Sequence, residues 1–80
     1  MTQRYLNQIA FEIQKDWKNV SPYALPYLNA MKLLYTVKDK YICDDASSIV
    51  LYFLANANGW RGEVAKRVKK ELKDMLKDVV

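Results

Sequence analysis

Apolar residues return every three or four positions along most of this 80-residue chain, and this spacing constrains the fold more than any other feature. The first such set is Leu6, Ile9, Ala10, Ile13 and Trp17, which would lie on one face of a helix. Strand-type alternation is nearly absent, and only two Gly and two Pro interrupt the chain. The spacing therefore predicts an all-α fold, a compact bundle of three to four helices in a single domain, 1–80.

The length and the residue types narrow the class of protein. Eighty residues are too few for two independent cores, and a hydrophobic content of 51% is too high for intrinsic disorder. The start of the chain has no apolar signal-peptide core. The longest apolar run, residues 49–55, is far shorter than the roughly 20 residues that cross a bilayer. We therefore expect a cytoplasmic protein with no membrane-spanning segment.

Two helices are expected in the first half of the chain. The first spans residues 2–18, with Thr2 as its N-cap. The second begins at Ser21-Pro22, a capping serine followed by a proline at the first helical position, although Pro26 allows a later start. One broad face of the second helix carries Tyr23, Ala24, Tyr27, Leu28, Met31, Leu34 and Tyr35, with Leu25 and Leu33 outside it. This helix should fade at residues 36–37, before a stretch that shows no clear period.

Two further helices are expected in the second half. The third starts at Asp44 or Asp45, either of which can cap it. Its residues 49–54 are apolar on every side, which predicts a central helix enclosed by its neighbours. Residues 56–59 predict its end, and the fourth helix follows from near Trp60 to about Asp78. The apolar stripe of this last helix is Trp60, Val64, Val68, Leu72, Met75, Leu76 and Val79.

The fourth helix carries most of the charge excess. Residues 58–80 hold seven basic and four acidic side chains, which supplies three of the four net positive charges. At about 100° per residue, five lysines project within one narrow sector. They are Lys66, Lys69, Lys70, Lys73 and Lys77, called here the lysine ridge. The adjoining sector carries Glu63, Glu71, Asp74 and Asp78, with Arg67 among them. The ridge has two interpretations: a surface for phosphates or an acidic protein, or a solvated face with pairs such as Glu63 with Arg67.

A DNA-binding helix-turn-helix is one alternative for the last two helices. Ala55 and Gly59 are four residues apart and Val68 follows nine later, which is the spacing of that motif. Asn58, at a position that is normally apolar, and Gly62, in the first turn of the would-be recognition helix, argue against it. The other interpretation is a helical hairpin in which Gly59 ends the third helix.

The residue inventory argues against catalysis. The chain has no His, the commonest general base near neutral pH, and its one Cys, Cys43, therefore has no Cys–His partner. The same counts exclude a Cys/His zinc site and an internal disulfide. Asp44 and Asp45 suit a helix cap better than a metal site, and no glycine-rich phosphate loop occurs. We expect a protein that is not an enzyme and has no cofactor, no metal and no small-molecule substrate.

Two groups of residues are candidates for a partner contact. Phe11 lies off the apolar stripe of the first helix, on the face that carries Arg4 and Lys15. Trp60 and Arg61 form a pair typical of interface hot spots. The alternative for this pair is that Trp60 plugs the end of the bundle and Arg61 caps carbonyls at the end of the third helix. Leu25 and Leu33 would extend the Phe11 surface if they are contiguous with it.

Three stretches give the chain a resemblance to a known group of proteins. They are residues 26–31 (Pro-Tyr-Leu-Asn-Ala-Met), residues 48–57, and residues 60–65 (Trp-Arg-Gly-Glu-Val-Ala) with 69–72. On these blocks the chain resembles small uncharacterised proteins encoded by bacteriophages and other mobile elements of bacteria. The resemblance covers about residues 17–76 and carries no activity and no catalytic residues. It implies an accessory protein that acts in the cytoplasm of a bacterial host.

These observations lead to two hypotheses about function. The first is a non-catalytic protein that binds another protein, or a second copy of itself, through Phe11 and the exposed parts of the first two helices. The second is nucleic-acid binding through the lysine ridge, with Arg61 and Arg67 nearby.

Overall fold

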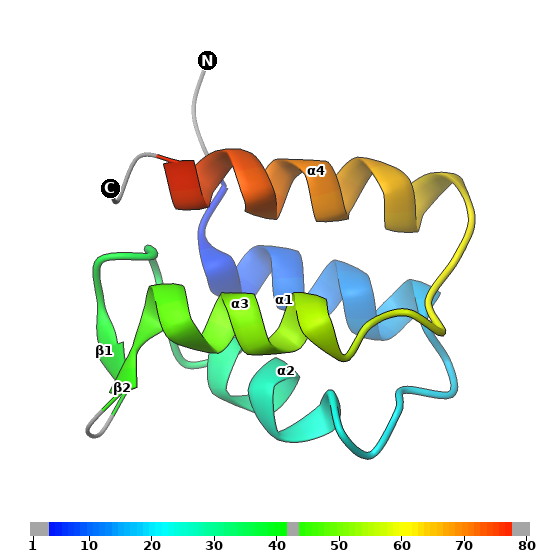
Figure 1. Ribbon diagram of the computed structural model, residues 1–80, viewed down its shortest axis with the longest axis horizontal. Helices are drawn as coiled ribbons and strands as arrows, with labels where there is room; N and C mark the ends of the chain where they lie inside the picture. Colours follow the sequence, from blue (N-terminus) through cyan, green and yellow to red (C-terminus); the bar gives the residue numbers. More distant parts are fainter. Residues whose placement is uncertain (1–3, 42–43, 78–80) are drawn as a thin grey trace.

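The computed structural model describes residues 4–41 and 44–77, which form four helices and one minimal strand pair (Figure 1). The helices are α1 (Leu6–Asp16), α2 (Leu25–Met31), α3 (Ala46–Ala55) and α4 (Glu63–Lys77). In Figure 1, α1 and α3 run in the same direction and α4 runs antiparallel to them. Since α2 and α4 each pack against both α1 and α3, the two lie on opposite sides of the α1–α3 pair. The all-α fold is confirmed.

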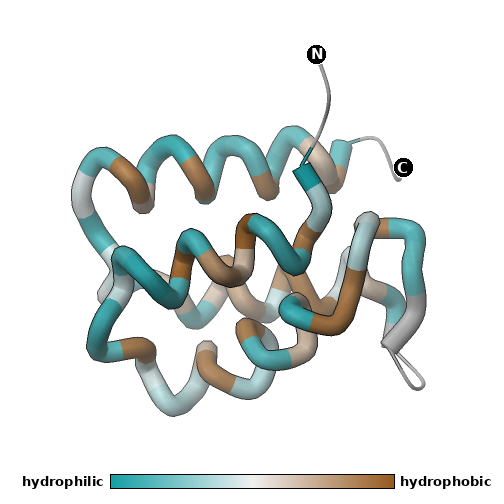
Figure 2. The backbone as a smooth tube through the Cα atoms, turned by 180° about the vertical axis from the view of Figure 1, so that it is seen from behind, coloured by the Kyte–Doolittle hydropathy of each residue, from teal (hydrophilic) through white to brown (hydrophobic). Residues whose placement is uncertain are grey.

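The core is made by the apolar stripes that the spacing predicts. All five members of the first stripe, Leu6 to Trp17, are buried, and no polar or charged residue is buried among those described. In α4 the buried members are Val68, Leu72 and Met75, with Val64 and Leu76 partly buried. Val79 lies outside the described residues. Figure 2 shows the apolar stretches of α4 on the side that faces α1, so this helix contributes one stripe and leaves its charged sectors to solvent.

α1 begins later than the sequence predicts. It starts at Leu6, and the predicted cap, Thr2, lies outside the described residues. The backbone N–H groups of Leu6 and Asn7 donate to the carbonyls of Tyr35 and Leu34, at 2.7 and 2.9 Å. Tertiary contacts therefore satisfy N–H groups that every helix start leaves without an intrahelical partner. The helix also ends at Asp16 rather than Lys18.

α2 begins at the later of its two predicted starts and ends earlier than predicted. Ser21 caps a turn that precedes the helix, not the helix itself: its Oγ accepts from the N–H of Tyr23 at 3.2 Å, and its carbonyl accepts from the N–H groups of Ala24 and Leu25 at 3.0 and 2.9 Å. The helix starts at Leu25 and places Pro26 in its first turn, so the later of the two predicted starts is the observed one. It stops at Met31, and the prediction that it reaches Tyr35 is wrong. After Met31 the chain turns, with the N–H groups of Leu33 and Leu34 donating to the carbonyls of Ala30 and Met31 at 3.0 and 3.1 Å, and the carbonyls of residues 34 and 35 then accept from the start of α1.

Beside the stretch without a clear period, two strands of two residues each form a pair. β1 (Lys40–Tyr41) pairs antiparallel with β2 (Asp44–Asp45) directly before α3. Asp45 occupies the N-cap position of α3, but its side chain makes no capping hydrogen bond, so the predicted capping role is not seen. Instead, the carbonyl of Asp39 accepts from the N–H of Ala46 at 2.8 Å.

α3 is only half enclosed. Ala46, Ile49, Val50 and Phe53 face the core, whereas Leu51 and Tyr52 are 56% and 53% exposed. The expectation that residues 49–54 are covered on every side is therefore wrong. α1, α2 and α4 pack against one side of α3 and leave the other side open.

The connection from α3 to α4 is longer than a helix-turn-helix allows. Residues 56–62 separate the two helices, whereas the motif joins its helices with three or four residues at a crossing angle near 90–120°. Figure 1 shows α3 and α4 antiparallel. The geometry is that of a helical hairpin, as in the second interpretation, but α3 ends at Ala55 and Gly59 lacks the positive φ of a helix-ending glycine, so the role predicted for Gly59 is wrong.

Candidate partner-binding surface

Trp60 is a core residue. It is 2% exposed, its indole stacks on Trp17 with ring centroids 6.0 Å apart, and its Nε1–H donates to Asp16 Oδ2 at 2.8 Å. The hot-spot role predicted for Trp60 is therefore closed to it in this fold, and the core alternative is the observed one. Arg61, the next residue, is exposed.

Lys69 has the role that the sequence predicted for Arg61. Its Nζ donates to the carbonyls of Ala57 and Trp60, at 2.8 and 2.7 Å, beyond the C-terminal end of α3. It also lies 5.9 Å from the centroid of the Trp60 ring. Burial lowers the pKa of Lys69, and the charges of Lys73 and Arg61 lower it further. Lys69 therefore ties α4 to the α3–α4 connection and is not a free member of the lysine ridge.

The other ridge lysines divide into two groups. Lys70 and Lys77 both pair with Asp74, at 3.2 and 3.6 Å. Lys66 and Lys73 are exposed and have no ion-pair partner among the described side chains. They flank Lys69 at positions i−3 and i+4, which are neighbours on a helix surface. With the exposed Arg61, they form what we call the basic edge: Arg61, Lys66 and Lys73.

A charge network joins α1 to α4. The Arg4 guanidinium is bidentate on Glu71, at 3.1 and 2.6 Å, and lies 2.6 Å from Glu12 Oε1. Glu12 also accepts from Arg67, which therefore pairs across helices rather than with Glu63. The hydrogen bond from Arg67 has the largest effect on the pKa of Glu12 and lowers it. Burial raises this pKa and the contact with Arg4 lowers it, so the net result is a lowered pKa. The carboxylates of Glu71 and Glu12 raise the pKa of Arg4, with Glu71 contributing most and burial opposing them. Arg4 and Arg67, predicted as binding residues, are thus engaged within the molecule.

Phe11 is as accessible as predicted, at 59% exposed. Its ring lies 6.0 Å from Lys32 Nζ, at the end of α2, and Lys15 on the same helix is exposed. Leu25 and Leu33 are also exposed. The structure does not bring Arg4 to Phe11 as a free cation, because Arg4 is committed to Glu12 and Glu71.

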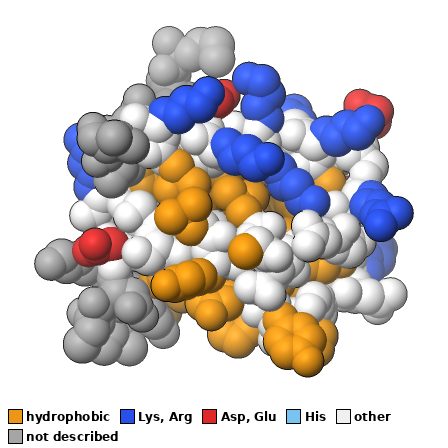
Figure 3. All heavy atoms as spheres, in the orientation of Figure 1, with side chains coloured by type: hydrophobic (Ala, Val, Ile, Leu, Met, Phe, Trp, Pro, Cys, Tyr) orange, Lys and Arg blue, Asp and Glu red, His pale blue; other side chains and the backbone are white. Residues whose placement is uncertain are grey.

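The open side of α3 is the surface that sequence reasoning missed. Ser48, Leu51, Tyr52 and Ala55 share it at intervals of three and four, and we call this set the α3 face. Tyr27 of α2 extends it, with its ring centroid 5.5 Å from that of Tyr52. Figure 3 shows apolar side chains over this part of the molecule and a row of Lys and Arg above them, along α4. The sequence did contain a sign of this surface: a chain of 80 residues is too small to cover every side of a helix that is apolar all round, so one apolar side must stay exposed.

Acidic residues are missing from most of the chain around this surface, and the exposed Asp45 at the N-cap of α3 is the exception. Residues 17–38 and 46–62 contain no Asp or Glu, while they include Lys18, Lys32, Lys38 and Arg61. The acids lie in α1, in the hairpin with the residues next to it, and from Glu63 onward. The α3 face is therefore apolar at its centre and flanked by positive charge on its α4 side.

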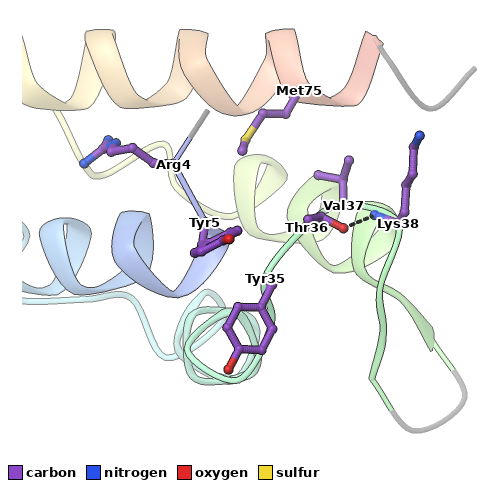
Figure 4. A pocket seen from close by; sticks show the side chains of 7 residues that line it. All are labelled: Arg4, Tyr5, Tyr35, Thr36, Val37, Lys38 and Met75. Atoms are coloured by element: carbon purple, nitrogen blue, oxygen red, sulfur yellow. Dashed lines mark hydrogen bonds between the residues drawn. The ribbon is translucent and has the colours of Figure 1, made fainter. Parts of the chain in front are cut away.

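A separate pocket of about 330 Å³ lies between the start of α1 and the end of α4. Its lining is Arg4, Tyr5, Tyr35, Thr36, Val37, Lys38 and Met75. Figure 4 shows the Arg4 side chain directed away from Thr36 and Lys38, and the Tyr35 hydroxyl directed away from Met75. Thr36 Oγ1 is used by the N–H of Lys38 and by Asp39. The pocket thus lacks the converging polar groups of a small-molecule site.

Within residues 4–41 and 44–77, no cluster of three or more His, Cys, Asp or Glu suits a metal ion. In the same part of the chain, no helix has both the length and the apolar character needed to cross a membrane. Cys43 lies outside the described residues.

Comparison with known proteins gives no match: no family model fits the chain, and no curated protein or solved structure is significantly similar to it.

Proposed function

We propose that this protein is a non-catalytic binding module that engages a protein partner through the α3 face. The observation that carries the proposal is the half-exposed pair Leu51 and Tyr52, at the centre of a helix that is otherwise built for a core. Adjacent exposed apolar side chains with a polar rim are typical of protein–protein surfaces. The small residues Ser48 and Ala55 let a partner backbone approach closely.

The residue inventory supports a role without catalysis. A chain with no His has no side chain whose ordinary pKa lies near neutrality. The acids of the α1–α4 network are held by arginines, which suits a structural role.

Nucleic-acid binding is the second candidate function. The observation that favours it is the basic edge, whose three exposed cations lie on one side of α4 and next to it. Three lysines of the ridge argue against it, because they already contact groups within the molecule: Lys69 two carbonyls, and Lys70 and Lys77 the carboxylate of Asp74. Binding to duplex or single-stranded DNA or RNA would weaken steeply with salt, and fluorescence anisotropy at low salt tests this directly.

The deciding experiment for the α3 face is a matched pair of variants. Leu51→Gln with Tyr52→Gln removes the apolar centre without changing charge, and Gln is a good helix former. Phe11→Gln is the control, since Phe11 is an aromatic residue equally exposed on another helix. Pull-down with nuclease from the source cell should show a protein band that the double variant loses and the control retains.

A band that the Phe11→Gln variant loses and the double variant retains would place the binding site at Phe11, as the sequence predicts. For self-association through Phe11, sedimentation of wild type and Phe11→Asp decides: identical monomers exclude it. A band that both variants retain would refute the α3 face, and a band lost on nuclease treatment would favour nucleic acid. The proposal does not depend on a cytoplasmic location or on the resemblance to mobile-element proteins, which both stay predictions.

A further inference from the structure

We infer that the partner of the α3 face is an amphipathic helix whose polar side is acidic. This inference rests on the proposed function and adds the chemical class of the partner.

The first argument is shape. The α3 face is a single helix side, with residues at 48, 51, 52 and 55, and a helix of ten residues is about 15 Å long. α4 lies alongside α3 and antiparallel to it (Figure 1). A partner helix set along α3 would place residues i, i+3, i+4 and i+7 on Leu51 and Tyr52, which is a common mode of helix recognition.

The second argument is charge. Lys69 reaches the carbonyls of Ala57 and Trp60 beyond the end of α3, which fixes that edge of α4 beside α3. Lys66 and Lys73 flank Lys69 on the helix surface, and Figure 3 shows a row of Lys and Arg side chains above the apolar area. A helix on the α3 face therefore meets cations along one side. Because Lys66 and Lys73 are about 10 Å apart along the axis, carboxylates two turns apart would face both.

The third argument excludes a second copy of this chain as the occupant. Two α3 faces packed against each other would bring together residues 46–62 and parts of 17–38, which carry cations and no carboxylate, with Asp45 of each copy exposed at the N-cap of its α3. The basic edge of each copy has three cations, so this one carboxylate would leave most of the positive charge unopposed. An apolar centre with unopposed cations disfavours such a pair.

The fourth argument separates an acidic helix from a polyanion. A nucleic acid or an anionic lipid surface would use the basic edge but has no specific need for Leu51. An acidic amphipathic helix needs both parts of the surface. Dependence on Leu51 and on Lys73 together is therefore the signature of the proposed partner.

The experiment is selection from a yeast-displayed library of 18-residue helical peptides. Apolar positions are held at i, i+3, i+4 and i+7, and the other positions vary among Glu, Lys, Ser and Gln. The folded full-length protein is the bait, and far-UV circular dichroism checks each bait variant. We expect enriched peptides to carry Glu two turns apart and a net negative charge.

Three bait variants locate the binding site. The double variant Leu51→Gln with Tyr52→Gln should weaken binding of an enriched peptide at least tenfold. Arg61→Glu with Lys73→Glu should weaken it about tenfold, because each substitution replaces an attraction to an acidic peptide by a repulsion. Lys15→Glu, a charge reversal on the exposed side of α1, should leave it within twofold.

The outcomes separate this inference from the proposed function. Enriched peptides that are neutral or basic, but still need Leu51, would overturn the acidic class and leave the α3 face as the site. Enrichment that ignores Leu51, or no enrichment, would overturn both. Binding of a DNA or RNA oligonucleotide, or of phosphatidylglycerol vesicles, that is lost in Arg61→Glu with Lys73→Glu and unaffected at Leu51 would overturn the inference in favour of that polyanion. Dimerisation abolished by the Leu51 variant would overturn it in favour of a second copy.

Discussion

Gly62 is the residue whose backbone conformation allows α4 to start where it does. Its φ is +111°, a region that residues with a Cβ rarely adopt, and its carbonyl accepts from the N–H of Lys66 at 3.0 Å. Nothing lies within 4 Å of the place where a Cβ would be. Glycine is therefore favoured at this position by the backbone conformation, and not because a side chain would lack space.

Substitution of the two glycines should separate these effects. Gly62→Ala should lower the free energy of unfolding by about 1 to 2 kcal/mol, because alanine is strained at this φ. Gly59→Ala is the control: its Cβ would make an ordinary contact, 3.9 Å from the Trp17 ring. Urea denaturation measures both. Equal losses at the two positions would contradict the role given to φ.

Lys69 shows the limit of counting charges on a helix. The sequence places it in the same sector as Lys66 and Lys73, and helical geometry alone cannot tell the three apart. Lys69 differs because its side of α4 meets the α3–α4 connection, where carbonyls need donors. The sequence thus identified the lysine ridge, while the fold decided which lysines are free to bind.

At the scale of elements, α1 and α4 are joined by charge as well as by apolar contact. Glu12, Glu71, Arg4 and Arg67 form the exposed side of that joint. These pairs are partly exposed, so each contributes modestly to stability. Their other effect is to fix which side of α4 faces α1, and so to leave the basic edge beside α3.

The network predicts a dependence of stability on pH. A carboxylate with a lowered pKa stabilises the fold above its unfolded pKa, and this contribution is lost as the pH falls through the folded value. For Glu12 the free energy of unfolding should therefore fall below about pH 4.5. Glu12→Gln should lower the free energy of unfolding by about 1 kcal/mol at pH 7, and the stability of this variant should decrease less steeply in acid. The variant keeps the part of the pH dependence that comes from Asp39, whose pKa is lowered by the N–H groups of Thr36 and Tyr35.

Chemical denaturation from pH 7 to pH 3 measures this. Glu63→Gln is the control for loss of one carboxylate, and should stay within about 0.5 kcal/mol of wild type at pH 7. A Glu12→Gln protein with the wild-type slope in acid would contradict the assignment.

At the scale of the whole molecule, one core joins all four helices. Trp17 follows α1 and Trp60 precedes α4, and their rings stack on each other. The stack also reaches α3, because the ring centroids of Trp17 and Phe53 are 6.2 Å apart. A domain of this size with a single core usually unfolds as one unit.

Two probes should therefore report one transition. Tryptophan fluorescence follows the Trp17–Trp60 stack, and far-UV circular dichroism follows the helices, so their urea midpoints should coincide. Trp17→Phe and Trp60→Phe each leave a single reporter and identify its signal. A fluorescence midpoint clearly below that of circular dichroism would show that the stack opens before the helices melt.

The sequence by itself determined the helical class, the approximate positions of the four helices and most of the core, because apolar residues at helical spacing must be buried together. It also determined that acids are missing from residues 17–38 and 46–62. Only the tertiary structure decided where α1 begins, since carbonyls of Leu34 and Tyr35 accept from its first N–H groups, and where α2 ends, since the chain turns after Met31. It also decided that one side of α3 is open, because three neighbours cannot enclose a fourth helix in so small a domain, and this made an expected core helix the candidate binding surface.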